Sequence, residues 1–172
     1  MFILSQILVV VSDIFFIISM LNSKKKNLVF YLIISTILFA CHYMCLGGWT
    51  GAAIAWLELV YLILMYVLEL KDKTAYGVYL SIATTILTVI LSLITWNTWI
   101  SVLPMLAMIV YLTTMRFKKV IIVKSGALIR LTLNAIYMLI LKSYFGAVLS
   151  VVIILFTIVG MINDYKNCDA RK

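Results

Sequence analysis

Seven apolar runs, each close to the length that crosses a lipid bilayer, fill almost the whole of this sequence. A spanning helix needs roughly 20 apolar residues, and only short charged or turn-forming breaks separate the runs. Lipid offers no hydrogen-bond partner to free backbone groups, and no strand alternation is visible, so the runs must be helical. The predicted spans are residues 2–22, 28–46, 51–70, 75–95, 98–115, 120–141 and 144–163.

The composition supports a membrane protein rather than a soluble domain. Hydrophobic residues make up 66% and charged residues 12% of the 172 positions, against roughly 45–50% and about 25% in soluble domains. The N-terminal run lacks a basic leader and a small-residue cleavage site, so we expect a retained first helix. We predict an all-α membrane protein of seven transmembrane helices.

The positions of the basic residues predict how the chain is oriented. Most of the 14 lysines and arginines lie in or beside the breaks after the first, third and fifth runs, or in the C-terminal tail. The positive-inside rule places these segments in the cytoplasm and the N-terminus outside. Trp49, Trp96 and Trp99 fall at the outer interface, as aromatic anchors do. Orientation explains the net charge of +8, and no nucleic-acid partner is expected.

The sequence shows signs of an internal duplication. Residues 7–24 match residues 102–119 at an offset of 95. The matched pairs are Met20 with Met115, Ser19 with Thr114, Phe16 with Tyr111 and Lys24 with Lys119. Because the linker between the units is a single helix, the second unit enters the membrane in the same orientation as the first. Such parallel repeats are one plan of membrane transporters. We predict a three-helix unit at 1–70, a linker helix at 71–97, a second unit at 98–163 and a cytoplasmic tail at 164–172.

Two stretches resemble a known family. They are Ser35…His42-Tyr43…Leu46-Gly47-Gly48-Trp49-Thr50-Gly51-Ala52 and Leu103-Pro104…Tyr111-Leu112…Met115. They resemble the YgjV-type bacterial inner-membrane proteins over nearly the whole chain, which implies the bacterial cytoplasmic membrane. The plan of three helices, a linker and three helices is similar to the SWEET and PQ-loop carriers and to the nicotinamide-riboside transporters of the PnuC type.

The resemblance to SWEET carriers has gaps that bear on the substrate. Those carriers use prolines in several helices as hinges, and asparagines in the third helix of each unit to hold the substrate. Here only Pro104 is present, and it is the predicted hinge. Spans 51–70 and 144–163 lack a midspan asparagine, so the sugar-binding residues do not carry over.

Polar residues inside the spans are the candidates for a functional site. An ionisable group at the centre of a spanning helix costs at least roughly 2.5–3.5 kcal/mol on insertion scales. Helical spacing places Arg130, Asn134 and Tyr137 on one face of the sixth span. The predicted substrate-cavity residues are Asp13, His42, Glu58, Arg130, Asn134 and Tyr137. Ser5, Ser12 and Ser19 recur every seven residues and would line the same cavity if these faces converge.

Structural roles are open for the same residues. Arg130 could pair with Asp13 or Glu58 and fix helix packing, and His42 could be an interfacial hydrogen-bonding group. The fourth span carries a stripe of hydroxyl side chains that can bond back to the preceding turn, which favours packing over cavity lining. The stripe comprises Ser81, Thr84, Thr85, Thr88, Ser92 and Thr95.

These features predict a small SWEET-like carrier that moves a polar metabolite by alternating access. Transport would be facilitated or proton-coupled, with Asp13 as the residue best placed to carry a proton. The expected partners are the lipid bilayer and a small polar metabolite, and the chain could form a homo-oligomer. The alternatives are a non-transporting immunity, sensor or assembly protein and the substrate-capture subunit of an energy-coupled importer. No enzyme motif is present, and neither a cofactor nor a metal is expected.

Overall fold

Seven helices account for nearly all of the described chain in the computed structural model, which describes residues 2–45, 49–71, 76–94, 99, 102–140 and 144–169. The helices are α1 (Phe2–Leu21), α2 (Lys25–Cys45), α3 (Trp49–Leu70), α4 (Gly77–Ile94), α5 (Val102–Met115), α6 (Val120–Ile140) and α7 (Tyr144–Asp169). The prediction of an all-α protein with seven helices is confirmed. Several boundaries differ by a few residues: α2 begins at Lys25 rather than residue 28, α3 begins at Trp49 rather than residue 51, and α7 continues to Asp169 through part of the predicted tail.

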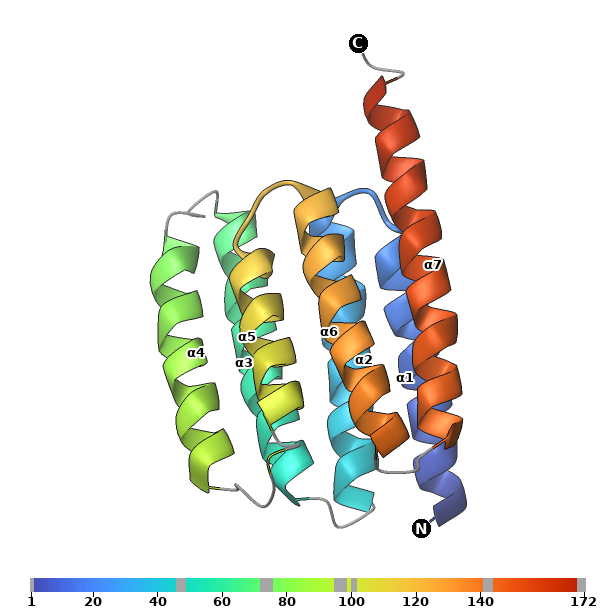
Figure 1. Cartoon of the computed structure of the whole chain (residues 1–172). Helices are drawn as coiled ribbons and strands as arrows, with labels where there is room; N and C mark the ends of the chain where they lie inside the picture. Colours follow the sequence, from blue (N-terminus) through green and yellow to red (C-terminus); the bar gives the residue numbers. More distant parts are fainter. Residues whose placement is uncertain are drawn as a thin grey trace.

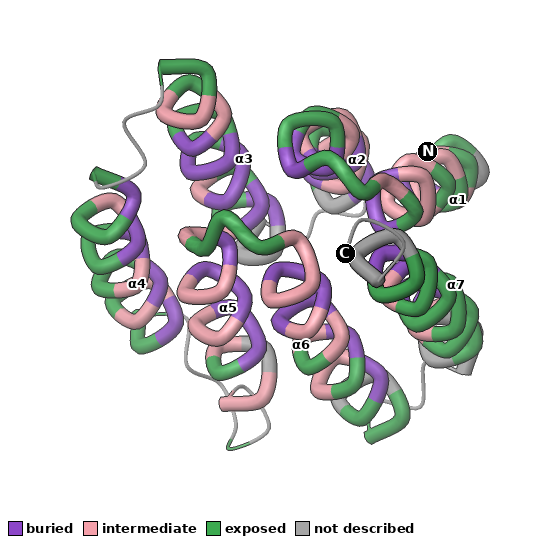
Figure 2. The backbone as a smooth tube through the Cα atoms, turned by 90° about the horizontal axis from the view of Figure 1, so that it is seen from above, coloured by how far each residue is buried: buried purple, intermediate pink, exposed green. Residues whose placement is uncertain are grey.

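The helices stand side by side and alternate in direction, so that α1, α3, α5 and α7 all run the same way (Figure 1). Seen from above, α1, α2 and α3 form one row, and α4, α5, α6 and α7 form a second row beside it (Figure 2). Sequential helices pack against each other along both rows, and α1 also packs against α7. The chain therefore forms a closed ring of helices, with α1 next to α7 at one end and α3 next to α4 at the other.

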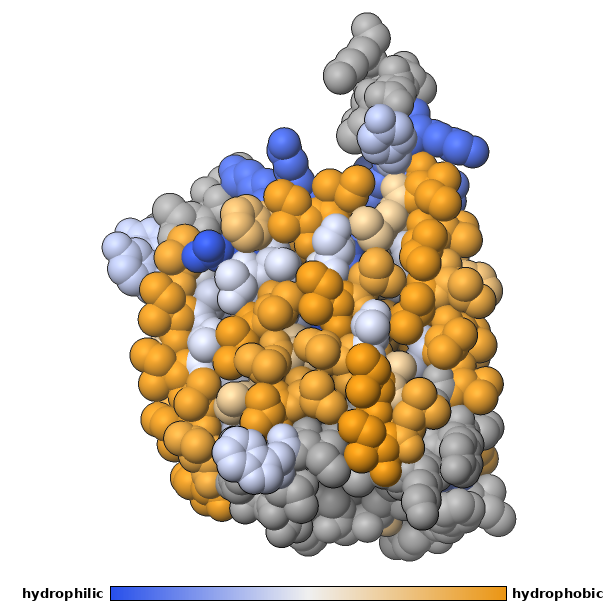
Figure 3. Space-filling view, in the orientation of Figure 1, coloured by the Kyte–Doolittle hydropathy of each residue, from blue (hydrophilic) through white to orange (hydrophobic). Residues whose placement is uncertain are grey.

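The outer surface has the character of a membrane protein. Five helices are long enough and apolar enough to cross a membrane, and α5 adds a shorter apolar stretch at Met105–Met115. Figure 3 shows a broad apolar band over the visible face, with hydrophilic residues gathered at the end where α7 projects. We call this end the basic end, because Lys24, Lys71, Lys118 and Lys119 lie exposed on it.

The apolar core lies in the half of the bundle nearest the basic end. The described residues of its main cluster fall between the middle of their helices and that end, with Met108 at the middle of α5. The cluster consists of Met20, Leu28, Val29, Leu32, Tyr61, Leu62, Met65, Met108, Tyr111, Leu112, Met115, Val123 and Ala127. Towards the opposite end, several buried apolar residues are alanines: Ala40, Ala52, Ala55 and Ala135. Leu131 and Ile153 are also buried in that half.

The serine stripe of α1 packs against α2 and does not line a cavity. The hydroxyl of Ser12 donates to the Ser35 carbonyl oxygen at 2.8 Å, and that of Ser19 donates to the Leu28 carbonyl oxygen at 2.7 Å. All three serines are at most 1% exposed. Small hydroxyl side chains let two helix backbones approach and bond across the contact. The expectation that Ser5, Ser12 and Ser19 line a polar cavity is therefore wrong.

The hydroxyl stripe of α4 has the packing role that the sequence favoured. Ser81, Thr84, Thr88 and Ser92 are buried along one face of this helix. Thr84 and Thr88 donate to carbonyl oxygens one turn earlier, at 2.9 and 2.8 Å. Their hydroxyls are thereby satisfied within the helix, and the stripe can pack against neighbouring helices without unpaired donors.

Two glycines set the closest helix contacts. A Cβ at Gly126 would meet the side chain of Thr114 at 1.8 Å, and a Cβ at Gly160 would meet the carbonyl oxygen of Met20 at 2.1 Å. The first contact joins α6 to α5 and the second joins α7 to α1. Only glycine permits backbones to approach this closely, so Gly160 helps to close the ring.

The division into two three-helix units stays a prediction. Several residues that the 95-residue offset pairs are nevertheless alike in their surroundings. Met20 and Met115 are both fully buried in the core, and Phe16 packs against the cluster that contains Tyr111. The helix between the predicted units is α4, and the structure places it beside both α3 and α5.

Candidate functional site

A bidentate ion pair joins the two rows of helices near the middle of the bundle. Nη1 and Nη2 of Arg130 donate to Oε1 and Oε2 of Glu58, at 2.5 and 3.0 Å. Arg130 is the central residue of α6, and Glu58 lies near the centre of α3. Their side chains are 17% and 6% exposed. The pair holds two opposite charges at the depth where an unpaired charge is most costly.

Tyr111 of α5 lies directly against this pair. The guanidinium carbon of Arg130 is 4.5 Å from the centre of the Tyr111 ring, a distance at which a cation is attracted to an aromatic face. Tyr111 is fully buried, and its hydroxyl has no hydrogen-bond partner among the described residues. Most buried hydroxyls have a partner, so a hydroxyl without one among the described residues is unusual beside a charged pair.

A second hydrogen-bonded group lies one turn from Glu58 towards the basic end. The hydroxyl of Tyr61 donates to the Leu112 carbonyl oxygen at 2.8 Å and lies 3.0 Å from the hydroxyl of Ser81. Ser81 also donates to the Leu112 carbonyl, at 3.2 Å. These contacts join α3, α4 and α5 and fix the face of α3 that carries Glu58.

The structure distinguishes between Asp13 and Glu58, the two predicted partners of Arg130. Arg130 pairs with Glu58, and Asp13 is in none of the ion pairs among the described residues. Asp13 is a half-buried residue of α1, a helix that packs against α2 and α7. The structure thus brings together Glu58 and Arg130 and leaves Asp13 outside their pair.

The remaining predicted residues are distributed along the helices. His42 is buried in α2, and its Nδ1 lies 2.8 Å from the Ser5 hydroxyl, which is the interfacial hydrogen bond considered above. Asn134 is half-buried, one turn of α6 beyond Arg130. The side chain of Tyr137 lies outside the described residues. Pro104 lies in the first turn of α5, and its role as a hinge stays a prediction.

Two buried ion pairs near the basic end were missed by the sequence analysis. Lys25 of α2 pairs with Glu69 of α3, and Lys124 of α6 pairs with Asp164 of α7 at 2.6 Å. Lys124 also donates to the Gly160 carbonyl oxygen at 3.2 Å and is completely buried. A signal was present, because Glu69 and Asp164 are separated by the same 95 positions that relate the proposed units.

The Arg130–Glu58 centre has the chemistry of an exchangeable binding site for an acidic group. A planar guanidinium stays charged in proteins and matches a carboxylate or a phosphate with two parallel hydrogen bonds. Glu58 now occupies that position. An incoming acid could take it over, and the free hydroxyl of Tyr111 could provide another hydrogen bond.

Comparison with known proteins gives one match. The model of a family described as bacterial inner membrane protein, Imp-YgjV, matches residues 3–168. No curated protein and no solved structure gives a significant match.

Proposed function

We propose that this chain, which belongs to the Imp-YgjV family of bacterial inner membrane proteins, is a small carrier for polar metabolites that works by alternating access. The two rows of helices move relative to each other and expose a central site to one side of the membrane at a time. The substrate carries a carboxylate or phosphate group that binds to Arg130. The carrier performs no chemical reaction on it.

The observation that carries this proposal is the ion pair between Arg130 and Glu58. It joins helices of opposite rows at mid-depth, where substrate sites of repeat-built transporters lie. An acidic substrate displaces Glu58 from the guanidinium and so loosens the contact between the rows. When the substrate leaves, Glu58 returns and the rows close again.

The packed core near the basic end supports a conformation that is closed on that side. Large buried side chains fill the half near the basic end, and two further ion pairs join neighbouring helices there. In the proposed cycle, this conformation seals the basic end, and the central site is reached from the opposite end.

Asp13 is the proposed site of proton coupling. Its carboxyl is half-buried near the centre of α1 and joins no described ion pair. It can therefore gain or lose a proton without breaking such a pair. Without this coupling, the carrier facilitates movement down the gradient of the substrate.

Uptake into proteoliposomes tests the proposal. The purified chain should accumulate at least one class of labelled compound from a library divided into carboxylates, phosphates, zwitterions and neutral sugars. We expect saturable uptake of an acid-bearing class. Thr132→Val should leave this uptake unchanged, because Thr132 is an exposed residue of α6, the helix that carries Arg130. If folded protein moves no class under either a substrate or a proton gradient, the carrier function is wrong.

The packing of α1 against α2 favours a second candidate, a non-transporting membrane protein. Their contact is fixed by three buried serines and His42, as in a rigid scaffold. This candidate requires no water at the level of Arg130. In a cysteine-free background, Asn134→Cys should react with a small thiol reagent in a carrier and stay unreactive in a scaffold.

The orientation is tested by labelling from outside the cell. In the proposed topology, the basic end lies in the cytoplasm. With Cys41, Cys45 and Cys168 replaced, Ser23→Cys and Lys118→Cys should be protected from an impermeant maleimide added to spheroplasts. Cysteine at Asn97 or Ser143 should react at once. The reversed labelling pattern would place the basic end outside.

A further inference from the structure

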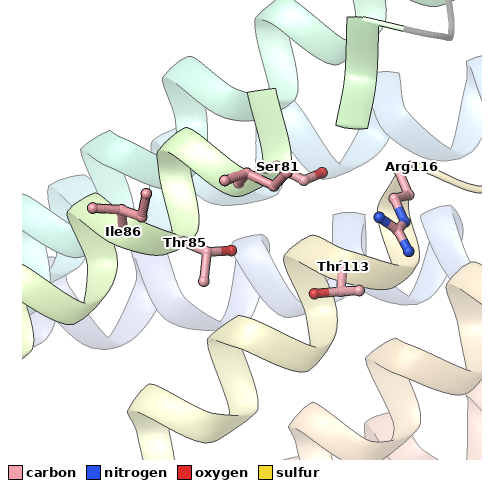
Figure 4. Close-up of a pocket in the computed structure, with 6 residues that line it drawn as sticks. Ser81, Thr85, Ile86, Thr113 and Arg116 are labelled. Atoms are coloured by element: carbon pink, nitrogen blue, oxygen red, sulfur yellow. The ribbon is translucent and has the colours of Figure 1, made fainter. Parts of the chain in front are cut away.

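A groove between α4 and α5 is not explained by the central site. Its volume is about 200 Å³, and its lining comes from the two helices and from Arg116, the residue that follows α5 (Figure 4). The lining residues are Ser81, Ile82, Thr85, Ile86, Thr113 and Arg116. The groove lies near the basic end of the bundle, away from the pair formed by Glu58 and Arg130.

The lining is charged at one end of the groove and combines hydroxyl and apolar side chains along the rest. Arg116 lies at the basic end, Thr113, Ser81 and Ile82 follow, and Thr85 and Ile86 lie furthest towards the middle of the bundle. Ile86 is nine residues into α4, about 13 Å from its start at 1.5 Å per residue. A charged end that continues into a wall of apolar and hydroxyl side chains suits a phospholipid, whose charged headgroup is followed by ester oxygens and acyl chains.

The mouth of the groove carries positive charge. Arg116 is half-buried and is in none of the ion pairs among the described residues. Its guanidinium carbon lies 5.0 Å from the centre of the Phe117 ring. The exposed ammonium groups of Lys118 and Lys119 follow in the chain and add to the positive charge.

The groove adjoins the face of α4 that meets lipid. Ile82 and Ile86 are 52% and 54% exposed, and Tyr79, one turn nearer the basic end, is 73% exposed. These residues belong to a helix that is apolar enough to span the membrane. A molecule in this groove therefore contacts the bilayer directly, which favours a lipid over a soluble anion.

We propose that this groove binds an anionic phospholipid from the leaflet at the basic end. The phosphate lies against Arg116, the glycerol and ester oxygens lie beside Thr85 and Thr113, and an acyl chain lies along Ile82 and Ile86. Basic pockets between spanning helices on the cytoplasmic side are suited to such headgroups. The site would exist whether or not the protein is a carrier.

Native mass spectrometry of the detergent-purified full chain tests the proposal. Phosphatidylglycerol is the probe, and phosphatidylcholine with the same acyl chains is the neutral comparison. We expect Arg116→Gln to weaken phosphatidylglycerol binding about fivefold, the factor associated with one basic residue at an anionic membrane surface. Lys26→Gln is the matched control, because Lys26 is an exposed lysine at the same end but on α2.

A second variant tests the apolar part of the groove. Ile86→Tyr narrows the groove at an exposed position and leaves its charge unchanged, so it should also weaken phosphatidylglycerol binding. The proposal is overturned if Lys26→Gln weakens binding as much as Arg116→Gln, which would indicate general charge attraction. It is also overturned if glycerol 3-phosphate competes as well as the lipid, or if Ile86→Tyr leaves lipid binding unchanged.

Discussion

Replacing Arg130 by methionine and Glu58 by leucine together should leave the protein folded and abolish uptake. Either replacement alone should lower the free energy of unfolding by about 3–5 kcal/mol, because it leaves one buried charge without its partner. The double variant should regain most of this loss, since apolar residues often replace a buried ion pair well. Thermal unfolding in detergent measures the stability, and uptake into proteoliposomes measures the function.

The double variant separates the two roles of this pair. Because Arg130 and Glu58 form a bidentate ion pair, each single variant should lose stability whether the protein is a carrier or a scaffold. Only a carrier needs the charges for its activity. A double variant that is stable and transports at the wild-type rate would therefore show that Arg130 does not bind the substrate. Thr132→Val should change neither quantity.

Lys124→Met should cause a loss of stability of the same size, about 3–5 kcal/mol, by leaving the buried carboxylate of Asp164 without its cation. Lys124 is completely buried and Asp164 is 8% exposed, so solvent can compensate little. The double variant Lys124→Met with Asp164→Leu should recover most of the stability. Melting curves of the purified variants check both results, with Lys118→Met at the exposed surface as the control.

This second pair should differ from the first in its effect on uptake. Lys124 and Asp164 join α6 to α7 near the basic end, away from the proposed substrate position. The double variant should therefore retain most of its uptake, which the Arg130 and Glu58 double variant loses. If uptake disappears in the stable Lys124 double variant, this pair takes part in the transport cycle and is more than an anchor.

The helices were predictable from the sequence because the bilayer fixes their length. Each apolar run had to become a helix of about the thickness of the membrane, and the breaks between runs marked the turns. The helix α7 extends beyond the predicted span, which stopped at the first charged residues. Asp164 and Lys166 continue the same helix, and Asp164 is held in place by a lysine of another helix.

Which polar residues meet could be predicted only in part. Its position inside a span identified Glu58 as a partner for Arg130, but the sequence could not choose it over Asp13, because that choice depends on how each helix is rotated and which helices are neighbours. The stripe of Ser5, Ser12 and Ser19 fits both a cavity wall and a helix contact. The structure shows a helix contact, because the hydroxyls of Ser12 and Ser19 donate to backbone carbonyl oxygens of α2.

The pairing of Lys124 with Asp164 also affects biosynthesis. The two residues are 40 positions apart, so at about 5–20 residues per second Lys124 is made roughly 2–8 seconds before its partner. Glu58, in contrast, precedes Arg130 and is already made when the arginine is added. During the delay, the ammonium group of Lys124 must remain hydrated at the membrane surface. The insertion of α7 then supplies the missing carboxylate and brings Gly160 against α1, so the newest segment completes both the charge pair and the ring.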